Sequence, residues 1–339
     1  MDKTVIFAVA GSGKTTHIVN SLSYEKRSLI VTYTIANYEN LYRKIIQKFD
    51  GDWPENIVLM RYFPFLYRFC YKPFLSDEIK ARGIIYEGNP NRYAKQTDKA
   101  FFITEKGYLY SNRISFILEA KQVIGDVQDR LIRYFDEFIV DEVQDLAGRD
   151  FNLLERLMET NISQLFVGDF YQHTFDTSRD GRVNGKLFES KSKYEKRFTD
   201  KGFICDSKSL INSWRCSPSV CRYITDNLGI EIHSNRPEDT DTCILLVSDS
   251  EQIQRINADQ KIVKLHYQKG ASFGFNHFNW GETKGEDQHN DVCVCLNKTT
   301  AKAFAAGTLS TLNPATRNKL YVAITRAHGS VYFVNEQNL

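Results

Sequence analysis

The stretch FAVAGSGKTTHIV, residues 7–19, decides the fold class of this chain. The apolar run TVIFAVA leads into it, and within it the pattern A-x-x-x-x-G-K-T extends from Ala8 to Thr15. Gly11 and Gly13 let the backbone curl so that its N–H groups point at phosphate oxygens, and the positive end of the following helix strengthens that attraction. A strand, a glycine-rich loop and a helix in this order predict a phosphate-binding loop.

The predicted loop supplies most of the residues expected to hold a nucleoside triphosphate. Lys14 would reach the β- and γ-phosphates, and the Thr15 hydroxyl would ligate Mg²⁺. The nucleotide-binding prediction covers Ala10, Gly11, Ser12, Gly13, Lys14, Thr15 and Thr16.

A second stretch, FIVDEVQDL at residues 138–146, carries two adjacent acids. Three apolar residues bring Asp141 and Glu142 to the carboxyl end of a predicted strand, the edge where phosphates bind in parallel sheets. Asp141 is predicted to hold the Mg²⁺ that Thr15 ligates, and Glu142 to accept a proton from the attacking water. An ordinary acidic strand end explains this stretch alone, but beside a phosphate loop the pattern favours hydrolysis.

The rest of the chain repeats the alternation of strands and helices. Short apolar runs recur at TVIFAVA, SLIVTYT, EFIVDE, SQLFVGD, CILLVS, KIVKLHY, DVCVCL and SVYFV. Apolar residues from Tyr38 to Phe49 have helical spacing, and a second helix is expected after Ser217 as N-cap, with Pro218 in its first turn and Gly229 at its end. The pattern predicts an α/β protein with mostly parallel sheets.

Composition sets limits on the class of protein. The 339 residues suffice for two domains, and 42% hydrophobic residues with only 7 prolines describe a globular chain. A net charge of +2 means that any polyanion must be met by local basic patches. Seven cysteines without a C-x-x-C pair fit neither a disulfide framework nor a zinc knuckle, and Cys293 and Cys295 are expected on a buried strand.

The sequence also bears on location. The apolar strand follows MDK directly, which leaves no signal peptide, and no apolar run reaches about 18 residues. We therefore expect a cytoplasmic protein with no membrane partner.

Five motifs, which follow one another along the chain, indicate which class of nucleotide-binding protein this is. They are DEVQD at 141–145, VGDFYQ at 167–172, NSWR at 212–215, GETKGED at 281–287 and LYVAITRA at 320–327. Together with the phosphate loop, this set resembles superfamily 1 DNA helicases of the UvrD/Rep type, in a compact form with reduced accessory insertions. The resemblance covers nearly the whole chain, with poorly matching stretches between the motifs.

The resemblance implies a fold and a set of roles. The fold would be two RecA-like P-loop NTPase domains, 1–205 and 206–339, with ATP in the cleft between them and small insertions at about 75–130 and 229–281. Gln172 would sense the γ-phosphate, and Arg215 and Arg326 would act as arginine fingers. Taken singly, an arginine is usually a surface residue, and a tryptophan such as Trp214 is usually a core residue. The adenosine contacts implied are Trp214 on the base and Gly285 and Glu286 near the ribose.

The nucleic-acid side rests on fewer residues. VTYTIAN resembles a family motif in which Thr32 or Thr34 would touch a backbone phosphate and Tyr33 would offer its ring to a base. The run LMRYFPFLYRFCYKPF, residues 59–74, includes Arg61 and Tyr62 and mixes cations with aromatic rings, as a single-strand groove does. A core helix with cationic rims is an equal alternative for this run.

Two functions from different classes remain open at this point. The first is an ATP-dependent translocase or helicase on single-stranded DNA, 3′ to 5′ as the family implies, acting in repair, replication or anti-phage defence. The second is an ATP-driven switch that regulates a partner without processive movement. RNA is an alternative to DNA as the bound strand. The one nuclease-like pattern in the sequence is E-x-K at Glu119 and Lys121, and its surroundings look helical, so any nuclease activity would come from a partner protein.

Overall fold

The computed structural model describes residues 2–91, 93–174, 177, 183–238, 241–285 and 288–339. Backbone contacts divide the chain into two compact units. Unit 1 comprises Met1–Ile6, Thr15–Gly168 and Phe175–Asp206, and unit 2 comprises Phe7–Lys14, Asp169–Thr174 and Ser207–Leu339. The predicted phosphate loop up to Lys14 thus packs chiefly with the second half of the chain.

Unit 1 is built on a six-stranded sheet with the order β3-β2-β6-β7-β1-β8. Neighbouring strands for which the pairing is defined run parallel. Ile30 of β2 pairs with Ile139 of β6, for example, and Ile139 pairs with Leu165 of β7. Because parallel strands share one carboxyl edge, the ends of β6 and β7 lie side by side there. The strands are β1 (Lys3–Phe7), β2 (Ser28–Thr32), β3 (Ile57–Arg61), β6 (Glu137–Asp141), β7 (Ser163–Gly168) and β8 (Ile204–Asp206).

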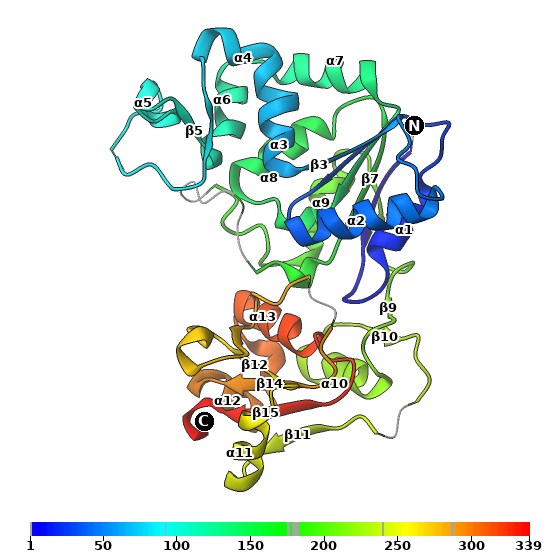
Figure 1. The fold of residues 1–339 in the computed structure, drawn as a ribbon, viewed down its shortest axis with the longest axis vertical. Coiled ribbons are helices and arrows are strands. Elements are labelled where there is room, and N and C mark those ends of the chain that lie inside the picture. Colours follow the sequence, from blue (N-terminus) through cyan, green and yellow to red (C-terminus); the bar gives the residue numbers. More distant parts are fainter. Residues whose placement is uncertain (1, 92, 175–176, 178–182, 239–240, 286–287) are drawn as a thin grey trace. The chain divides into compact units, whose positions relative to one another are not determined.

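Helices cover this sheet, and α2 (Ile35–Lys48) shows why they form. The Thr34 hydroxyl caps its N-terminus by accepting the Asn37 N–H at 3.1 Å, and the helix buries Leu41 and Ile45 beside β3 (Figure 1). The others are α1 (Lys14–Ser21), α3 (Tyr62–Pro64), the π-helix η1 (Phe65–Tyr71), α4 (Lys72–Ile79), α6 (Ile114–Ala120), α7 (Ile124–Tyr134), α8 (Gly148–Leu157) and α9 (Lys191–Thr199).

The aromatic and basic run at 59–74 divides between β3, α3, η1 and the start of α4. The π-helix buries Phe65, Phe69 and Tyr71, while Arg68 and Lys72 face solvent. The core alternative is therefore correct for η1.

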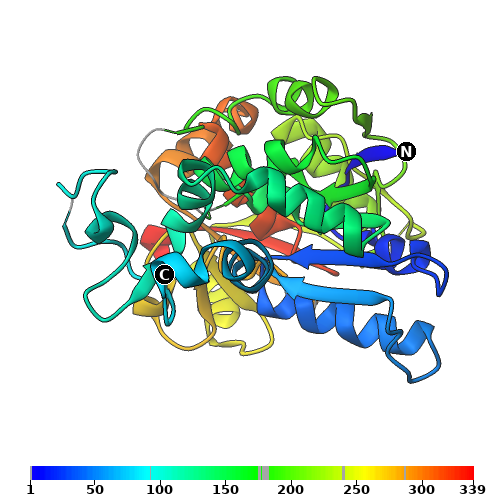
Figure 2. The ribbon, with the colours of Figure 1, turned by 90° about the horizontal axis from the view of Figure 1, so that it is seen from above.

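A small insertion lies between α4 and α6. It holds α5 (Lys99–Phe102) and two short parallel strands, β4 (Gly83–Ile85) and β5 (Tyr108–Tyr110). Both ribbon views show this segment, in cyan, at the margin of unit 1 (Figures 1 and 2).

Unit 2 contains a five-stranded parallel sheet with the order β11-β15-β14-β12-β13. Cys293 and Cys295 are buried on β14, as expected. The strands are β11 (Ile244–Val247), β12 (Val263–His266), β13 (His277–Asn279), β14 (Val292–Leu296) and β15 (Val331–Asn335); a separate pair is formed by β9 (Asn212–Ser213) and β10 (His233–Ser234).

Two helices of unit 2 matter for the candidate site. In α10 (Pro218–Leu228), Ser217 accepts the Val220 N–H and Gly229 ends the helix at φ 64°, as the sequence predicts. The C-terminal half of α13 (Pro314–Ile324) is buried on every side, which is typical of a helix inside a domain. The remaining helices are α11 (Ser250–Ala258) and α12 (Lys298–Ala305).

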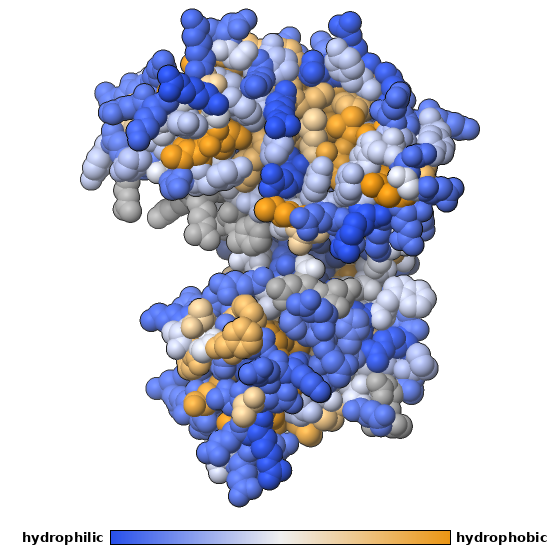
Figure 3. Space-filling model, in the orientation of Figure 1, coloured by the Kyte–Doolittle hydropathy of each residue, from blue (hydrophilic) through white to orange (hydrophobic). Residues whose placement is uncertain are grey.

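The two sheets confirm the predicted α/β class with parallel strands. On the face drawn in Figure 3, hydrophilic residues predominate over each unit and apolar residues form small separate patches. Among the described residues, every helix is too short or too polar to cross a lipid bilayer.

Candidate functional site

The predicted phosphate loop has the backbone conformation expected from its two glycines. Gly11 and Gly13 have φ values of 68° and 89°, the left-handed region that glycine adopts without strain. The Ser12 hydroxyl is buried, and no described residue offers it a hydrogen-bond partner. A buried hydroxyl in need of a partner, set in a curled loop before the N-terminus of α1, fits a phosphate oxygen.

Within unit 2, the loop is bound to the segment that carries Trp214 and Arg215. The Val9 N–H donates to the Leu210 carbonyl, and the Trp214 N–H donates to the Gly11 carbonyl, both at 2.9 Å. A Cβ on Gly11 would lie 2.6 Å from the Arg215 Cβ, so glycine is required here by space as well as by φ. The Trp214 side chain itself is 66% exposed, which leaves its ring accessible.

A buried tyrosine joins this loop to two other segments of unit 2. The Ala10 N–H donates to the Tyr321 hydroxyl at 2.9 Å, and that hydroxyl donates to the Asp169 carboxylate at 3.0 Å. Burial, followed by the nearby Asp169, raises the pKa of Tyr321 well above its usual range, so the hydroxyl remains a donor. Sequence reasoning missed this residue, although Tyr321 lies inside the quoted motif LYVAITRA.

Both predicted arginine fingers are held by backbone carbonyls. The Arg215 guanidinium donates to Thr325 O at 3.1 Å, and Arg326 donates from Nε to Val322 O and from Nη1 to Thr283 O, each at 3.1 Å. Arg326 is 1% exposed. Burying a guanidinium is costly unless it is hydrogen-bonded. These contacts offset the cost of burying the charge, and they also fix the orientation of the guanidinium.

The remaining predicted residues of unit 2 lie in short turns. Gln172 is buried in a 3₁₀ turn, Phe170–Gln172, which starts after Asp169 and in which the Asp169 carboxylate accepts the Tyr171 N–H at 3.0 Å. Gly285 is exposed with φ 90°. Glu286, predicted to approach the ribose, lies outside the described residues.

Unit 1 contributes the acids at the carboxyl edge of its sheet. Asp141 is buried, and its carboxylate accepts the Thr32 hydroxyl at 3.0 Å from the adjacent strand β2. Glu142 follows in the left-handed region at φ 55°, and its carboxylate accepts Nε2 of Gln144. A left-handed non-glycine residue costs of the order of 1 kcal/mol or more, and such strain concentrates at functional positions.

A glycine makes room for this arrangement. A Cβ on Gly168, at the end of β7, would lie 2.3 Å from Gln144 Oε1 and 2.9 Å from a methyl of Val143. Thr15 lies in the first turn of α1, in the same unit as the acids. Its hydroxyl and the Asp141 carboxylate are oxygen ligands of the kind that Mg²⁺ prefers.

The five residues predicted to meet nucleic acid differ in accessibility. Thr32 and Tyr62 are buried, the first bonded to Asp141 and the second with its hydroxyl 3.5 Å from that of Ser115. Burial makes both side chains inaccessible to a nucleic acid in this conformation, so their predicted contacts gain no support from it. Thr34 caps α2, and Arg61 and Tyr33 are partly exposed.

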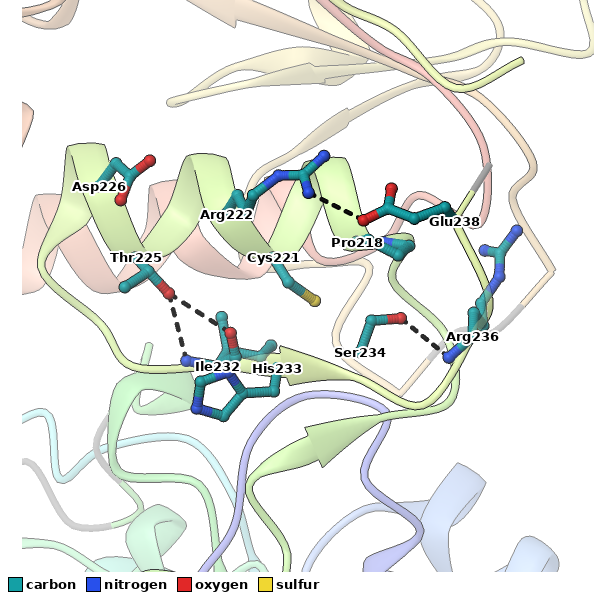
Figure 4. Close-up of a pocket in the computed structure, with 10 residues that line it drawn as sticks. All are labelled: Pro218, Cys221, Arg222, Thr225, Asp226, Ile232, His233, Ser234, Arg236 and Glu238. Carbon is teal, nitrogen blue, oxygen red and sulfur yellow. Dashed lines mark hydrogen bonds and ion pairs between the residues drawn. The ribbon is translucent and has the colours of Figure 1, made fainter. Parts of the chain in front are cut away.

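Unit 2 also has a pocket of about 410 Å³ beside α10 (Figure 4). Arg222 forms an ion pair with Glu238 at 2.9 Å across it, and Arg236 at its end donates to the Arg215 carbonyl at 2.7 Å. The described lining contains none of the predicted site residues; it consists of Pro218, Cys221, Arg222, Thr225, Asp226, Ile232, His233, Ser234, Arg236 and Glu238. We interpret the pocket as a neighbour of the candidate site that helps to hold Arg215.

Comparison with known proteins shows a likeness of fold. No protein-family model and no curated protein matches the sequence. Two solved structures of an arterivirus helicase, nonstructural protein 10, one of them in complex with DNA, share its fold with TM-scores of 0.51 and 15% identity. Each match covers 98% of this chain but only 60% or 59% of the helicase chain. At this identity the likeness concerns the fold alone.

Proposed function

We propose that this chain is an ATP-hydrolysing translocase or helicase that acts on single-stranded DNA. The observation that carries the proposal is the contact of Ala10 with Tyr321 and of Tyr321 with Asp169. A bound γ-phosphate would be sensed by a loop that is hydrogen-bonded to α13, the helix that ends just before Arg326. Hydrolysis at the loop can therefore change the position of that helix, which is what a motor requires.

In this proposal each predicted residue of the ATP site has a defined role. The loop N–H groups, the Ser12 hydroxyl and Lys14 bind the phosphates, and Thr15 and Asp141 hold Mg²⁺, which neutralises charge on the β- and γ-phosphates when bound. Glu142 accepts the proton of the attacking water.

The groups of unit 2 complete the assignment. Arg215 and Arg326 stabilise the charge that develops on the transferred phosphoryl oxygens, and Gln172 senses their presence. The exposed ring of Trp214 offers a stacking surface for the base.

The substrate proposal has two supports. The ordered motifs resemble UvrD/Rep helicases, and the solved structures of similar fold are viral helicases, one of which was solved with DNA. The 3′ to 5′ direction and the role in repair, replication or defence rest on the sequence resemblance.

The test is steady-state ATP hydrolysis by the purified chain without nucleic acid and with single-stranded DNA, duplex DNA or single-stranded RNA. We expect strong stimulation by single-stranded DNA, and loss of hydrolysis in Lys14→Ala. Stimulation would make unwinding of a tailed duplex the next measurement. Hydrolysis that no nucleic acid alters would contradict the motor and favour an ATP-driven switch acting on a protein.

A further inference from the structure

Three aromatic side chains from separate segments of unit 1 form a continuous row. The ring centroids of Tyr33 and Phe63 are 5.8 Å apart, and those of Phe63 and Tyr86 are 5.1 Å apart. Tyr33 follows β2, Phe63 lies in α3 after β3, and Tyr86 follows β4 of the insertion. We call these three residues the aromatic row.

One end of the aromatic row is anchored and the other is open. The buried Tyr62 ring lies 6.4 Å from Tyr33 and 5.6 Å from Phe63, which fixes that end on the core. Tyr86 is 65% exposed and meets Phe63 edge to face at 79°. A large ring held in solvent at the end of a packed row contributes little to the core and leaves its surface available for a ligand.

The position of Tyr86 is set by packing within the insertion. Phe101 packs against Phe116 of α6 at 5.8 Å, and Arg113 stacks over Phe101 at 3.9 Å. The Arg82 N–H also donates to the Gly107 carbonyl at 2.8 Å, close to the parallel pair β4 and β5. The insertion that carries Tyr86 is thus held together by its own contacts and packs on α6 through the Phe101 ring, at the margin of unit 1 visible in Figures 1 and 2.

The charge of the insertion indicates the kind of ligand. Between the end of α4 and the start of α6, residues 80–113 contain seven Lys and Arg against three Asp and Glu, a net charge of +4. The whole chain has a net charge of only +2. Basic side chains around exposed rings suit a polyanion with stackable faces more than an apolar peptide.

We infer that the aromatic row is a stacking platform for bases of single-stranded nucleic acid, and that the insertion supplies its outer ring, Tyr86. The inference rests on the proposed function. Tyr33 belongs to the motif VTYTIAN, and the contact that the inference adds is Tyr86, which lies outside the helicase-like motifs. Base stacking on rings is tolerant of sequence, so the platform would hold a strand without reading it. Neighbouring Lys and Arg would meet the phosphates.

The test is the binding of fluorescent oligothymidine and oligouridine, measured by anisotropy at low and moderate salt, to the full chain and to Tyr86→Ala. Loss of one stacking ring should weaken binding by about five- to 100-fold. Tyr86→Trp, which keeps a ring, should bind as tightly as the parent. The matched control is Tyr93→Ala, because Tyr93 lies in the same segment and is 94% exposed, and it should leave affinity unchanged.

The outcomes separate this inference from the proposed function. A parent chain that binds neither oligonucleotide would contradict both. A parent that binds, together with a folded Tyr86→Ala variant of equal affinity, would overturn the platform alone. An equal loss in Tyr86→Ala and Tyr93→Ala would also overturn it, because the effect would then belong to the segment in general and not to the aromatic row.

Discussion

Two tyrosines in different units show how burial decides which part of a side chain acts. Tyr321 is 0% exposed, and its hydroxyl serves both Ala10 and Asp169. Tyr86 is 65% exposed, and its ring continues the aromatic row. In the first case a polar group without water must have partners, and in the second an apolar ring faces water until a ligand covers it. If the proposed function is right, hydrolysis would rely on groups fixed by burial, and strand binding on accessible rings.

The two regions should therefore respond differently to small changes. Deleting a hydrogen-bonding atom around Tyr321 removes a partner from other buried groups, which costs about 1–3 kcal/mol. The aromatic row should tolerate a change of ring but not its loss, since stacking depends on the face of the ring.

The largest effect is expected from Glu142→Gln. The change removes the proton acceptor but keeps the shape of the side chain, so hydrolysis should fall by about 10²- to 10⁴-fold while ATP binding persists. Single-turnover hydrolysis and equilibrium binding of a fluorescent ATP analogue measure the two separately. Turnover at the parental rate would show that another group activates the water, and the assignment of Glu142 as the proton acceptor would be wrong.

Tyr321→Phe tests whether the buried hydroxyl matters as the comparison requires. The variant leaves the Ala10 N–H and the Asp169 carboxylate without this partner, and we expect the free energy of unfolding to fall by about 1–3 kcal/mol. The rate of ATP hydrolysis should fall as well, because the loop loses its connection to α13. Urea unfolding and steady-state hydrolysis measure these effects.

The control for Tyr321 is Tyr223→Phe in α10. The Tyr223 ring packs against Phe333 at 5.4 Å and is kept by the change. The Tyr223 side chain is partly buried, and this burial raises its pKa. The control should change stability by no more than about 0.5 kcal/mol. Equal effects of the two substitutions would remove the special role of Tyr321.

Thr32→Val sharpens the comparison inside unit 1. The Thr32 hydroxyl donates to Asp141 at 3.0 Å and thereby orients a carboxylate expected to ligate Mg²⁺. Loss of such a supporting contact typically weakens metal affinity by 10- to 100-fold, and we expect about tenfold in the Mg²⁺ concentration for half-maximal hydrolysis. Thr32→Ser keeps the hydroxyl and should stay near the parent. An unchanged Mg²⁺ requirement in Thr32→Val would contradict the supporting role.

Local rules predicted much of the fold. The strand-like runs correspond to strands, and the start and end of α10 follow from Ser217, Pro218 and Gly229, whose roles depend only on neighbouring backbone groups. The phosphate loop belongs to the same class, because Gly11 and Gly13 act through their own φ angles.

Contacts between distant residues could not be predicted in this way. Tyr321 and Asp169 are 152 residues apart, and no spacing in the sequence marks their hydrogen bond. The run at 59–74 was ambiguous because burial of η1 depends on partners such as Phe138, whose ring lies 5.9 Å from Phe65. The left-handed backbone of Glu142 likewise has no local signal, since nothing in DEVQD requires a positive φ.

The smallest effect is expected from the hydroxyl of Tyr33 in the aromatic row. Burial, followed by Asp145 and Asp150, raises the pKa of Tyr33 to about 12, so the phenol stays neutral well above pH 7 and does not repel a nucleic-acid backbone. Oligonucleotide affinity should show no step due to Tyr33 between pH 7 and about pH 9. Tyr33→Phe should bind within about twofold of the parent over that range, because stacking needs only the ring.

Stability gives a second, independent reading of the same pKa. An unfolded tyrosine loses its proton near pH 10, whereas folded Tyr33 keeps it to about pH 12, so the folded state binds more protons in that window. The stability linked to Tyr33 is therefore complete below about pH 10 and decreases from there towards pH 12. Urea midpoints of the parent and Tyr33→Phe at pH 9, 10 and 10.5 should diverge only at the upper end, the parent losing more. The affinity of the parent for the oligonucleotide could instead decrease as the pH rises from 7 to about 9, while that of Tyr33→Phe stays constant. That result would show a phenolate in the aromatic row and would contradict a neutral stacking surface.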